Sequence, residues 1–173
     1  MMARRGKGGL KRSLEGVSNK RASGGSGAAA LNQGKGQEIT GVTLPLPNKI
    51  KGWEFGGGSR LACANVEGQF YAVQGDCPRC AFDLWKGDLI IDDPGFEGKP
   101  LVACPTCSTT YSLKTGKYGP PLKRTGLQAF VGNLAKTATE GDAYKSAKAF
   151  AITVNEDDGR VFCRELKMAT YES

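Results

Sequence analysis

The sequence of 173 residues predicts a small, mainly β domain: an antiparallel β-sandwich with one inserted α-helix and an extended N-terminal tail. Three patterns carry this prediction. Short apolar runs alternate with glycine-containing turns over most of the chain, one later segment has helical spacing, and the first part of the chain is basic and rich in glycine. The length allows one domain with a hydrophobic core.

Seven short segments have the length and composition of β-strands. Residues 50–55 and 59–66 flank a glycine run, and residues 69–73 follow the turn Glu67-Gly68, as in a hairpin. The remaining expected strands are 99–103, 110–113, 150–154 and 161–166. Because short turns join neighbouring strands, we expect antiparallel pairing within the β domain, which we assign to residues 44–173.

Helical spacing occurs in the segment just before the last predicted hairpin. Leu127, Phe130, Val131, Leu134 and Ala135 follow the spacing i, i+3, i+4, i+7, i+8 that places side chains on one face of an α-helix. We therefore predict an inserted helix over about residues 126–138.

Residues 1–43 form the predicted tail. Residues 1–38 carry eight basic side chains against two acidic ones, so their net charge of +6 accounts for most of the +7 of the whole chain. Such a segment could be a transit-peptide remnant, a nucleic-acid arm or a strap on a partner. It lacks aromatic side chains that could stack on bases, so we expect no nucleic-acid binding and predict a strap on an acidic protein or lipid surface. No apolar run is long enough to span a bilayer, so no transmembrane segment is expected.

Four cysteines occur in two matching Cys-Pro-x-Cys turns, and the chain contains no histidine. They are Cys77, Cys80, Cys104 and Cys107. A Cys-x-x-Cys turn places two sulfurs close together, and two such turns can build a four-thiolate site for zinc or iron. We therefore predict that these four candidate metal ligands form one cluster.

The other cysteines and the tryptophans are expected to serve the fold. Cys63 and Cys163 lie in apolar strand segments and should pack in the core. Trp53 and Trp85 should be core or rim aromatics. Without histidine, no nucleophile has its usual base beside it, so we predict no catalytic residues and no enzyme activity.

The cysteine turns and their surroundings resemble the cluster loops of Rieske-type [2Fe-2S] domains. Residues 68–73 (Gly-Gln-Phe-Tyr-Ala-Val) resemble the strand before the first loop of that family, and residues 77–84 (Cys-Pro-Arg-Cys-Ala-Phe-Asp-Leu) resemble the loop. Residues 104–111 (Cys-Pro-Thr-Cys-Ser-Thr-Thr-Tyr) and Thr115-Gly116 resemble the second loop and its following strand. The resemblance covers roughly residues 50–166 and implies a Rieske-type β-sandwich whose two loops meet at one tip.

The chain departs from the family pattern at both histidines. Arg79 stands at the first position and Cys107 at the second. A guanidinium group cannot ligate a metal, so Cys80 would have to supply the second ligand of the first loop. A cluster on four thiolates would have a potential near about −400 mV, too low to oxidise a quinol. Three alternatives remain: a [2Fe-2S] electron carrier, a zinc or single-iron site, and a scaffold without metal.

The sequence is most similar to the histidine-lacking Rieske-like proteins of chloroplast thylakoids that accompany photosystems. This resemblance implies a non-catalytic peripheral subunit of a photosystem–antenna supercomplex, on the stromal side of the thylakoid membrane. The tail would anchor it to other subunits, and the domain would be a contact module with Arg79, Trp85 and Lys86 facing a partner. The alternative is a low-potential electron carrier with a four-cysteine iron–sulfur centre.

Overall fold

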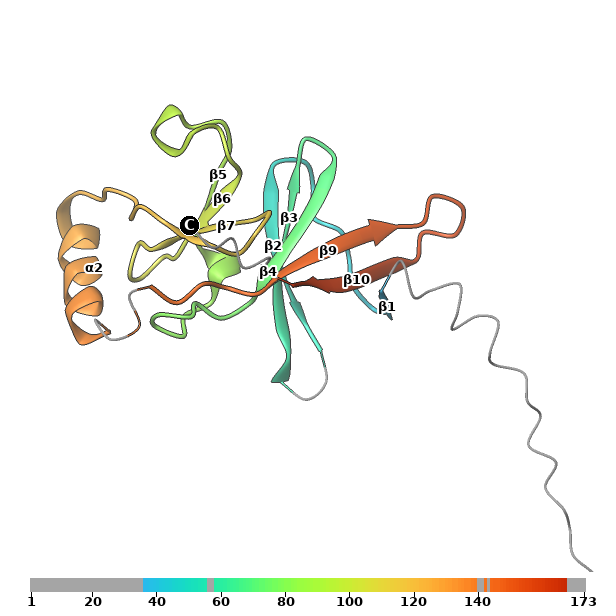
Figure 1. The fold of residues 1–173 in the computed structure, drawn as a ribbon, viewed down its shortest axis with the longest axis horizontal. Coiled ribbons are helices and arrows are strands. Elements are labelled where there is room, and N and C mark those ends of the chain that lie inside the picture. Colours follow the sequence, from blue (N-terminus) through green and yellow to red (C-terminus); the bar gives the residue numbers. More distant parts are fainter. Residues whose placement is uncertain (1–35, 56–57, 140–141, 143, 168–173) are drawn as a thin grey trace, which may run out of the picture.

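The structure is a computed structural model that describes residues 36–55, 58–139, 142 and 144–167 (Figure 1). Residues 1–35, which make up most of the predicted tail, lie outside the described residues. The strap role of the tail therefore stays a prediction.

Within the described residues, ten strands form two antiparallel sheets. The six-stranded sheet consists, in spatial order, of β1 (Gln37–Ile39), β10 (Val161–Leu166), β9 (Ala149–Val154), β4 (Gln69–Gln74), β3 (Arg60–Val66) and β2 (Lys49–Glu54). The four-stranded sheet consists of β5 (Asp88–Ile90), β6 (Leu101–Ala103), β7 (Thr110–Ser112) and β8 (Tyr118–Gly119). The predicted mainly β, antiparallel fold is confirmed. Two short 3-10 helices, η2 (Leu84–Lys86) and η3 (Pro94–Phe96), lie in the connections on either side of β5.

The turn between β3 and β4 is the predicted two-residue hairpin. Val66 pairs with Gln69, which leaves Glu67 and Gly68 as the loop. Both have positive φ, 52° and 90°, as the favoured tight hairpin turns with two left-handed residues require. This turn fixes the register that carries β4 toward the first cysteine.

Strand β1 comes from the segment assigned to the tail and joins the six-stranded sheet. It pairs with β10, with Gln37 opposite Cys163. Gly36 precedes it with φ of 98°, and a Cβ atom at this position would lie 2.3 Å from the carbonyl oxygen of Cys163. A glycine is therefore required where the chain enters the sheet, and the sheet begins before residue 44.

The main hydrophobic core lies between the two sheets and includes the cysteine turns. Its larger fully buried side chains are Val73, Leu84, Val102, Tyr111 and Leu113. A second cluster on the six-stranded sheet contains, among others, Trp53, Leu61, Cys63 and Val161. The core positions predicted for Trp53 and Cys63 are confirmed.

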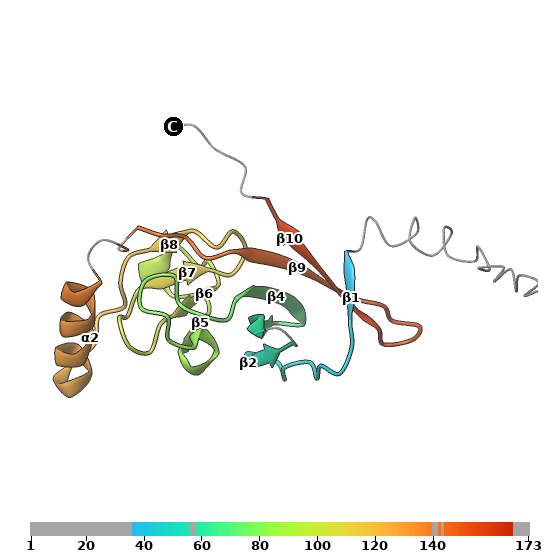
Figure 2. The ribbon, with the colours of Figure 1, turned by 90° about the horizontal axis from the view of Figure 1, so that it is seen from below.

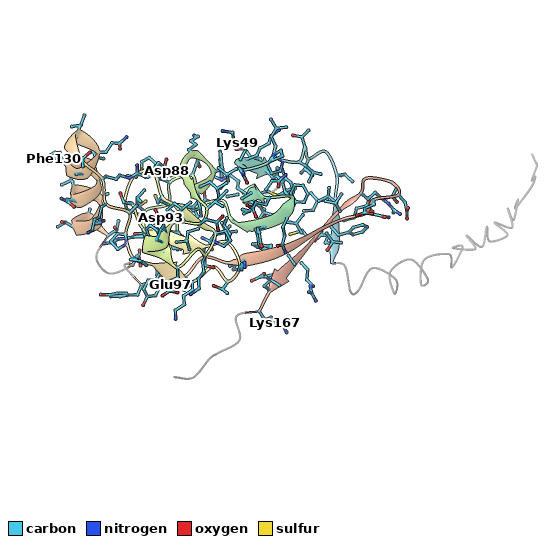
Figure 3. The ribbon with its side chains drawn as sticks, turned by 90° about the horizontal axis from the view of Figure 1, so that it is seen from above. Lys49, Asp88, Asp93, Glu97, Phe130 and Lys167 are labelled. Carbon is cyan, nitrogen blue, oxygen red and sulfur yellow. The ribbon has the colours of Figure 1, made fainter. Side chains whose placement is uncertain are left out.

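Helix α2 (Gly126–Ala138) has the predicted bounds and lies at one end of the molecule, opposite the β9–β10 turn (Figures 1 and 2). Its apolar side chains are mostly exposed: 78% for Leu127, 67% for Phe130 and 64% for Leu134. Phe130 is on the outer side of the helix (Figure 3). Gly132 is buried, so the helix meets the rest of the domain through its small residues. In the described part of the chain, no helix has both the length and the apolar character needed to cross a membrane.

Candidate metal centre

The four predicted cysteines lie together at the edge of the main core. Their sulfur atoms are all within 4.8 Å of one another. The shortest separations connect the two turns: 3.7 Å between Cys77 Sγ and Cys107 Sγ, and 3.5 Å between Cys80 Sγ and Cys104 Sγ. The predicted single cluster is confirmed, with Cys80 rather than Arg79 as the second sulfur position of the first loop.

The first turn, residues 77–82, follows β4 and is closed by two backbone hydrogen bonds. Ala81 N donates to Cys77 O at 2.8 Å, and Cys77 N donates to Phe82 O at 2.8 Å. Ala81 has φ of 59°, in the left-handed region, and this reverses the chain directly after Cys80. We call this segment the first knuckle.

The second turn, residues 104–109, connects β6 to β7 and repeats this backbone pattern. Ser108 N donates to Cys104 O at 3.1 Å, and Cys104 N donates to Thr109 O at 2.9 Å. Ser108 has φ of 61°, matching Ala81. We call this segment the second knuckle. The two knuckles thus present two cysteines each, three positions apart, in the same local geometry.

Salt bridges fix the base of the first knuckle to the six-stranded sheet. Arg60 on β3 pairs with Asp76 at 2.5 Å and with Asp83 at 3.1 Å. Its guanidinium group also lies 5.5 Å from the centroid of the Trp85 ring. Asp76 and Asp83 also form a β-bridge with each other. Arg60 therefore binds the two arms of the first loop together through both carboxylates.

Hydroxyl groups hydrogen-bond to two of the sulfur atoms. Tyr111 Oη lies 3.3 Å from Cys77 Sγ, and Cys107 Sγ donates to Thr109 Oγ1 at 3.3 Å. Burial raises the pKa of Tyr111, so its hydroxyl stays protonated and can donate to Cys77 as a thiolate. Hydroxyl donors of this kind stabilise a thiolate ligand.

Hydrogen bonds among the four thiols lower the pKa of some of them and raise the pKa of others. Hydrogen bonds, first from Cys104, lower the pKa of Cys77 to about 7 and place that of Cys107 well below its usual value. The hydrogen bond with Cys107 is the main cause that raises the pKa of Cys104. Part of the cluster is therefore disposed to be thiolate near neutral pH, the form that binds metals.

Helix α2 is attached to both knuckles by arginine side chains. From the first knuckle, Arg79 Nη2 donates to Lys136 O at 2.8 Å and Nε donates to Thr139 Oγ1 at 3.0 Å. Arg124, which lies just before α2, reaches the second knuckle, where its Nε donates to Ser108 Oγ at 2.9 Å. Arg124 Nη2 also lies 3.3 Å from Cys104 O and forms an ion pair with Asp88 at 2.6 Å.

The expectation that Arg79, Trp85 and Lys86 face a partner stays a prediction, and the structure shows what each side chain contacts within the domain. Arg79 is half-buried and engaged with the domain's own helix, because the carbonyl groups at a helix C-terminus attract a cation. Trp85 packs partly against the core beneath Arg60. Lys86 is exposed and pairs with Asp83 at 2.6 Å. Arg79 thus positions α2 over the site.

A groove of about 580 Å³ opens beside the first knuckle and the end of α2. It is lined by Arg79, Thr109, Tyr118, Gly119, Pro120, Pro121, Lys136 and Tyr144. Sequence reasoning singled out Arg79 but missed the groove, because the lining residues come from separate segments that only the fold brings together. Pro120 and Pro121 directly after the second loop were the available signal.

The two remaining cysteines stay outside the centre. Cys63 is buried and Cys163 is half-buried in the second core cluster. Burial raises the pKa of Cys63 to about 12 and that of Cys163 to about 11. Both therefore stay protonated at neutral pH and serve as small core residues, as predicted.

The two sheets and the paired cysteine loops define a Rieske-like fold, which confirms the fold expected from the loop motifs. No family description matches the sequence, and no curated protein is similar to it. Among solved structures, the ferredoxin of carbazole 1,9a-dioxygenase from Nocardioides aromaticivorans IC177 is similar at 13% identity and a TM-score of 0.50. The similarity covers 73% of this chain and 96% of the ferredoxin.

Two further solved structures are similar with lower TM-scores. A complex of reduced oxygenase and oxidized ferredoxin in carbazole 1,9a-dioxygenase contains a chain that is 20% identical, with a TM-score of 0.48, over 70% of this chain and 87% of that one. The putative NADH-dependent nitrite reductase small subunit from Mycobacterium tuberculosis is 19% identical, with a TM-score of 0.47, over 70% and 88%.

Proposed function

We propose that this protein is a non-catalytic electron-carrier domain whose four cysteines hold an iron centre and whose reaction partner is another protein. The observation that carries the proposal is the cluster of four thiols within 4.8 Å, from two knuckles of matching geometry. Thiolate ligands suit iron and zinc, and no histidine is present to compete. The likeness to a ferredoxin supports the fold of a small carrier.

The donor set fits an iron centre, which would supply one-electron chemistry at the cysteine sulfurs. Cys77, Cys104 and Cys107 are buried and would exclude water from the metal. Tyr111 would donate a hydrogen bond to the sulfur of Cys77 and so favour the reduced, more negative state.

Electrons would enter and leave on the side of Cys80, which is the more exposed of the four ligands. The groove is lined by Arg79, the neighbour of Cys80 in the first knuckle, and by Thr109 of the second knuckle. A partner that filled the groove would approach the first knuckle without disturbing the buried cysteines. Its surface would be acidic, because Arg79 and Lys136 contribute to the groove.

The test is redox titration of the full chain purified without oxygen from iron-supplied cells. We expect a reversible one-electron change with a thiolate-to-iron absorption band. Cys80→Ser should weaken and shift the band, whereas Cys63→Ser, which changes a thiol outside the site, should leave it unchanged. A colourless protein containing zinc or no metal would overturn the electron-carrier proposal.

We keep the photosystem role as a second candidate, because helix α2 has an uncovered apolar face. Leu127, Phe130 and Leu134 are exposed, and Lys123 and Lys136 stand near the two ends of the helix. Residues 123–139 include no acidic side chain. The proposed occupant is an apolar patch with an acidic rim on a photosystem–antenna supercomplex, at the stromal side of the chloroplast thylakoid.

The photosystem candidate also gives the basic tail, residues 1–43, an anchoring role on acidic protein or lipid surfaces. The test is co-migration of the protein with photosystem complexes from solubilised thylakoids on native gels. Leu127→Ser with Leu134→Ser should release it, and deletion of residues 1–35 should make its binding fail at moderate salt. Absence from thylakoid fractions would exclude the candidate, and full retention of the tail deletion would exclude the strap.

A further inference from the structure

We propose that the four-cysteine centre takes a single metal ion in tetrahedral coordination and not a two-iron cluster. This inference deepens the proposed function by naming the kind of centre, and it rests on that function only in taking the four cysteines as metal ligands. It departs from the centre that the Rieske-like fold would suggest.

The separations between sulfur atoms carry the inference. A metal–sulfur bond of about 2.3 Å in a regular tetrahedron gives sulfur–sulfur edges of about 3.8 Å. The two measured short contacts are 3.7 Å and 3.5 Å, and every sulfur lies within 4.8 Å of every other. One ion at the middle of the four sulfurs would therefore reach all of them.

A two-iron cluster needs a different arrangement. Its four protein ligands form two pairs on opposite irons with bridging sulfides between them, so the pairs must stand apart. In Rieske centres one iron takes the two cysteines and the other takes the ligands at the histidine positions. That pairing would set Cys77 and Cys104 against Cys80 and Cys107. The short contacts instead join Cys77 to Cys107 and Cys80 to Cys104, across that division.

The equivalence of the two knuckles also points to one ion. Each supplies cysteines at positions i and i+3, closed by the same pair of backbone hydrogen bonds and one left-handed residue. This is the Cys-x-x-Cys spacing of tetrahedral metal sites. The shift of the second ligand from Arg79 to Cys80 makes the first knuckle equal to the second.

The walls of the site oppose expansion to a larger cluster. Cys77, Cys104 and Cys107 are at most 2% exposed. Above the second knuckle, a Cβ atom on Gly132 would already lie 3.3 Å from Ser108 Oγ. Arg79 and Arg124 bind α2 and the segment before it to the two knuckles, so separating the knuckles would break those hydrogen bonds.

The charge balance is met by the same arginines. Each thiol that ligates releases its proton to solvent, so four thiolates on a divalent ion leave a net charge of −2. Arg79 adjoins Cys80 in sequence, and Arg124 Nη2 lies 3.3 Å from the carbonyl oxygen of Cys104. Two guanidinium groups near the site would offset this charge, and for iron the single electron would change it by one.

The experiment measures composition rather than activity. Full chain is purified without oxygen, stripped of metal, and reconstituted in parallel with Fe²⁺, with Fe²⁺ plus sulfide, and with Zn²⁺. Metal and acid-labile sulfide per chain are measured in the purified protein before stripping and again after each reconstitution, together with native mass. Cys63→Ser and Cys80→Ser serve as matched variants, since each removes one thiol and only the second removes a ligand.

We expect one metal per chain and no sulfide in all three arms, with the loss of at least half of the metal in Cys80→Ser alone. One iron as the metal of the native protein would support both the single-ion inference and the electron carrier. One zinc would support the single-ion inference and overturn the electron carrier. Two irons with two sulfides would overturn the inference and leave the electron carrier standing. Failure to bind any metal would overturn both.

Discussion

The two knuckles share one backbone geometry but differ in what surrounds them. The second knuckle is enclosed: Cys104, Cys107, Ser108 and Thr109 are all buried. The first is half open, because Cys80 and Arg79 are partly exposed and Arg79 lines the groove. Local sequence therefore determines the geometry in which each pair of cysteines is presented. The burial of each cysteine determines how much metal affinity its substitution should remove.

The largest expected effect is a difference in metal affinity between a cysteine substitution in the enclosed second knuckle and one in the half-open first knuckle. In Cys107→Ala no water can reach the vacated position, so metal affinity should fall by more than the roughly 100-fold typical of losing an outer partner. In Cys80→Ala water can take the open position, so a weaker three-thiolate site should remain. Competition with a chelator measures both affinities, and equal losses would contradict the asymmetry.

The next effect concerns the arginine of the first knuckle. Arg79→Ala removes hydrogen bonds to Lys136 O and Thr139 Oγ1, and a hydrogen bond from a charged group is worth about 1.5–3 kcal/mol. We expect a loss of about 2 kcal/mol in the free energy of unfolding in urea. Amide exchange in α2 should also accelerate. Lys86→Ala, with an exposed surface pair, should change neither.

Cys63, a buried thiol outside the two knuckles, should make the stability of the domain depend on pH in the alkaline range. The pKa of Cys63 is raised by burial from 9.0 to about 12, so above pH 9 the unfolded state loses its proton while the folded state keeps it. This contribution to stability is complete below pH 9 and is lost between pH 9 and about 12. At pH 10 the part already lost should amount to about 1.4 kcal/mol in the free energy of unfolding. A Cys63→Ala variant that showed the same alkaline loss would assign it to other groups.

The smallest expected effect lies in the hydroxyl partner of Cys77. Tyr111→Phe keeps the buried ring but removes the donor 3.3 Å from Cys77 Sγ. Metal affinity should fall by about tenfold, at the low end for an outer partner. In an iron-loaded protein, the potential should fall because the more negative reduced state loses a hydrogen bond. An unchanged potential would show that the hydroxyl does not donate to sulfur.

Local patterns in the sequence were sufficient to predict most of the elements. Alternating apolar residues and the Glu67-Gly68 turn predicted the β2–β4 meander, and the heptad-like spacing from Leu127 to Ala135 predicted α2. Strands β1, β5 and β8 were not predicted. They are only two or three residues long, and their pairing depends on partners that local sequence does not reveal.

The clustering of the four cysteines was predictable because each knuckle is a local motif. The role of Arg79 was not, because its acceptor at Lys136 O is 57 positions away and belongs to the backbone. The exposure of the apolar face of α2 could not be predicted from the sequence either. Helical periodicity shows that Leu127, Phe130 and Leu134 share a face, but it does not show whether that face meets the domain's own core.

The pairing of β1 with β10 sets an order of events during synthesis. Gln37 pairs with Cys163, so the six-stranded sheet is completed only after nearly the whole domain has left the ribosome. The outermost cysteines of the site, Cys77 and Cys107, are only 30 positions apart. If the site takes the proposed ion, the nascent chain would capture it while the sheet edge is still open, and the metal would then serve as a template on which the later strands assemble.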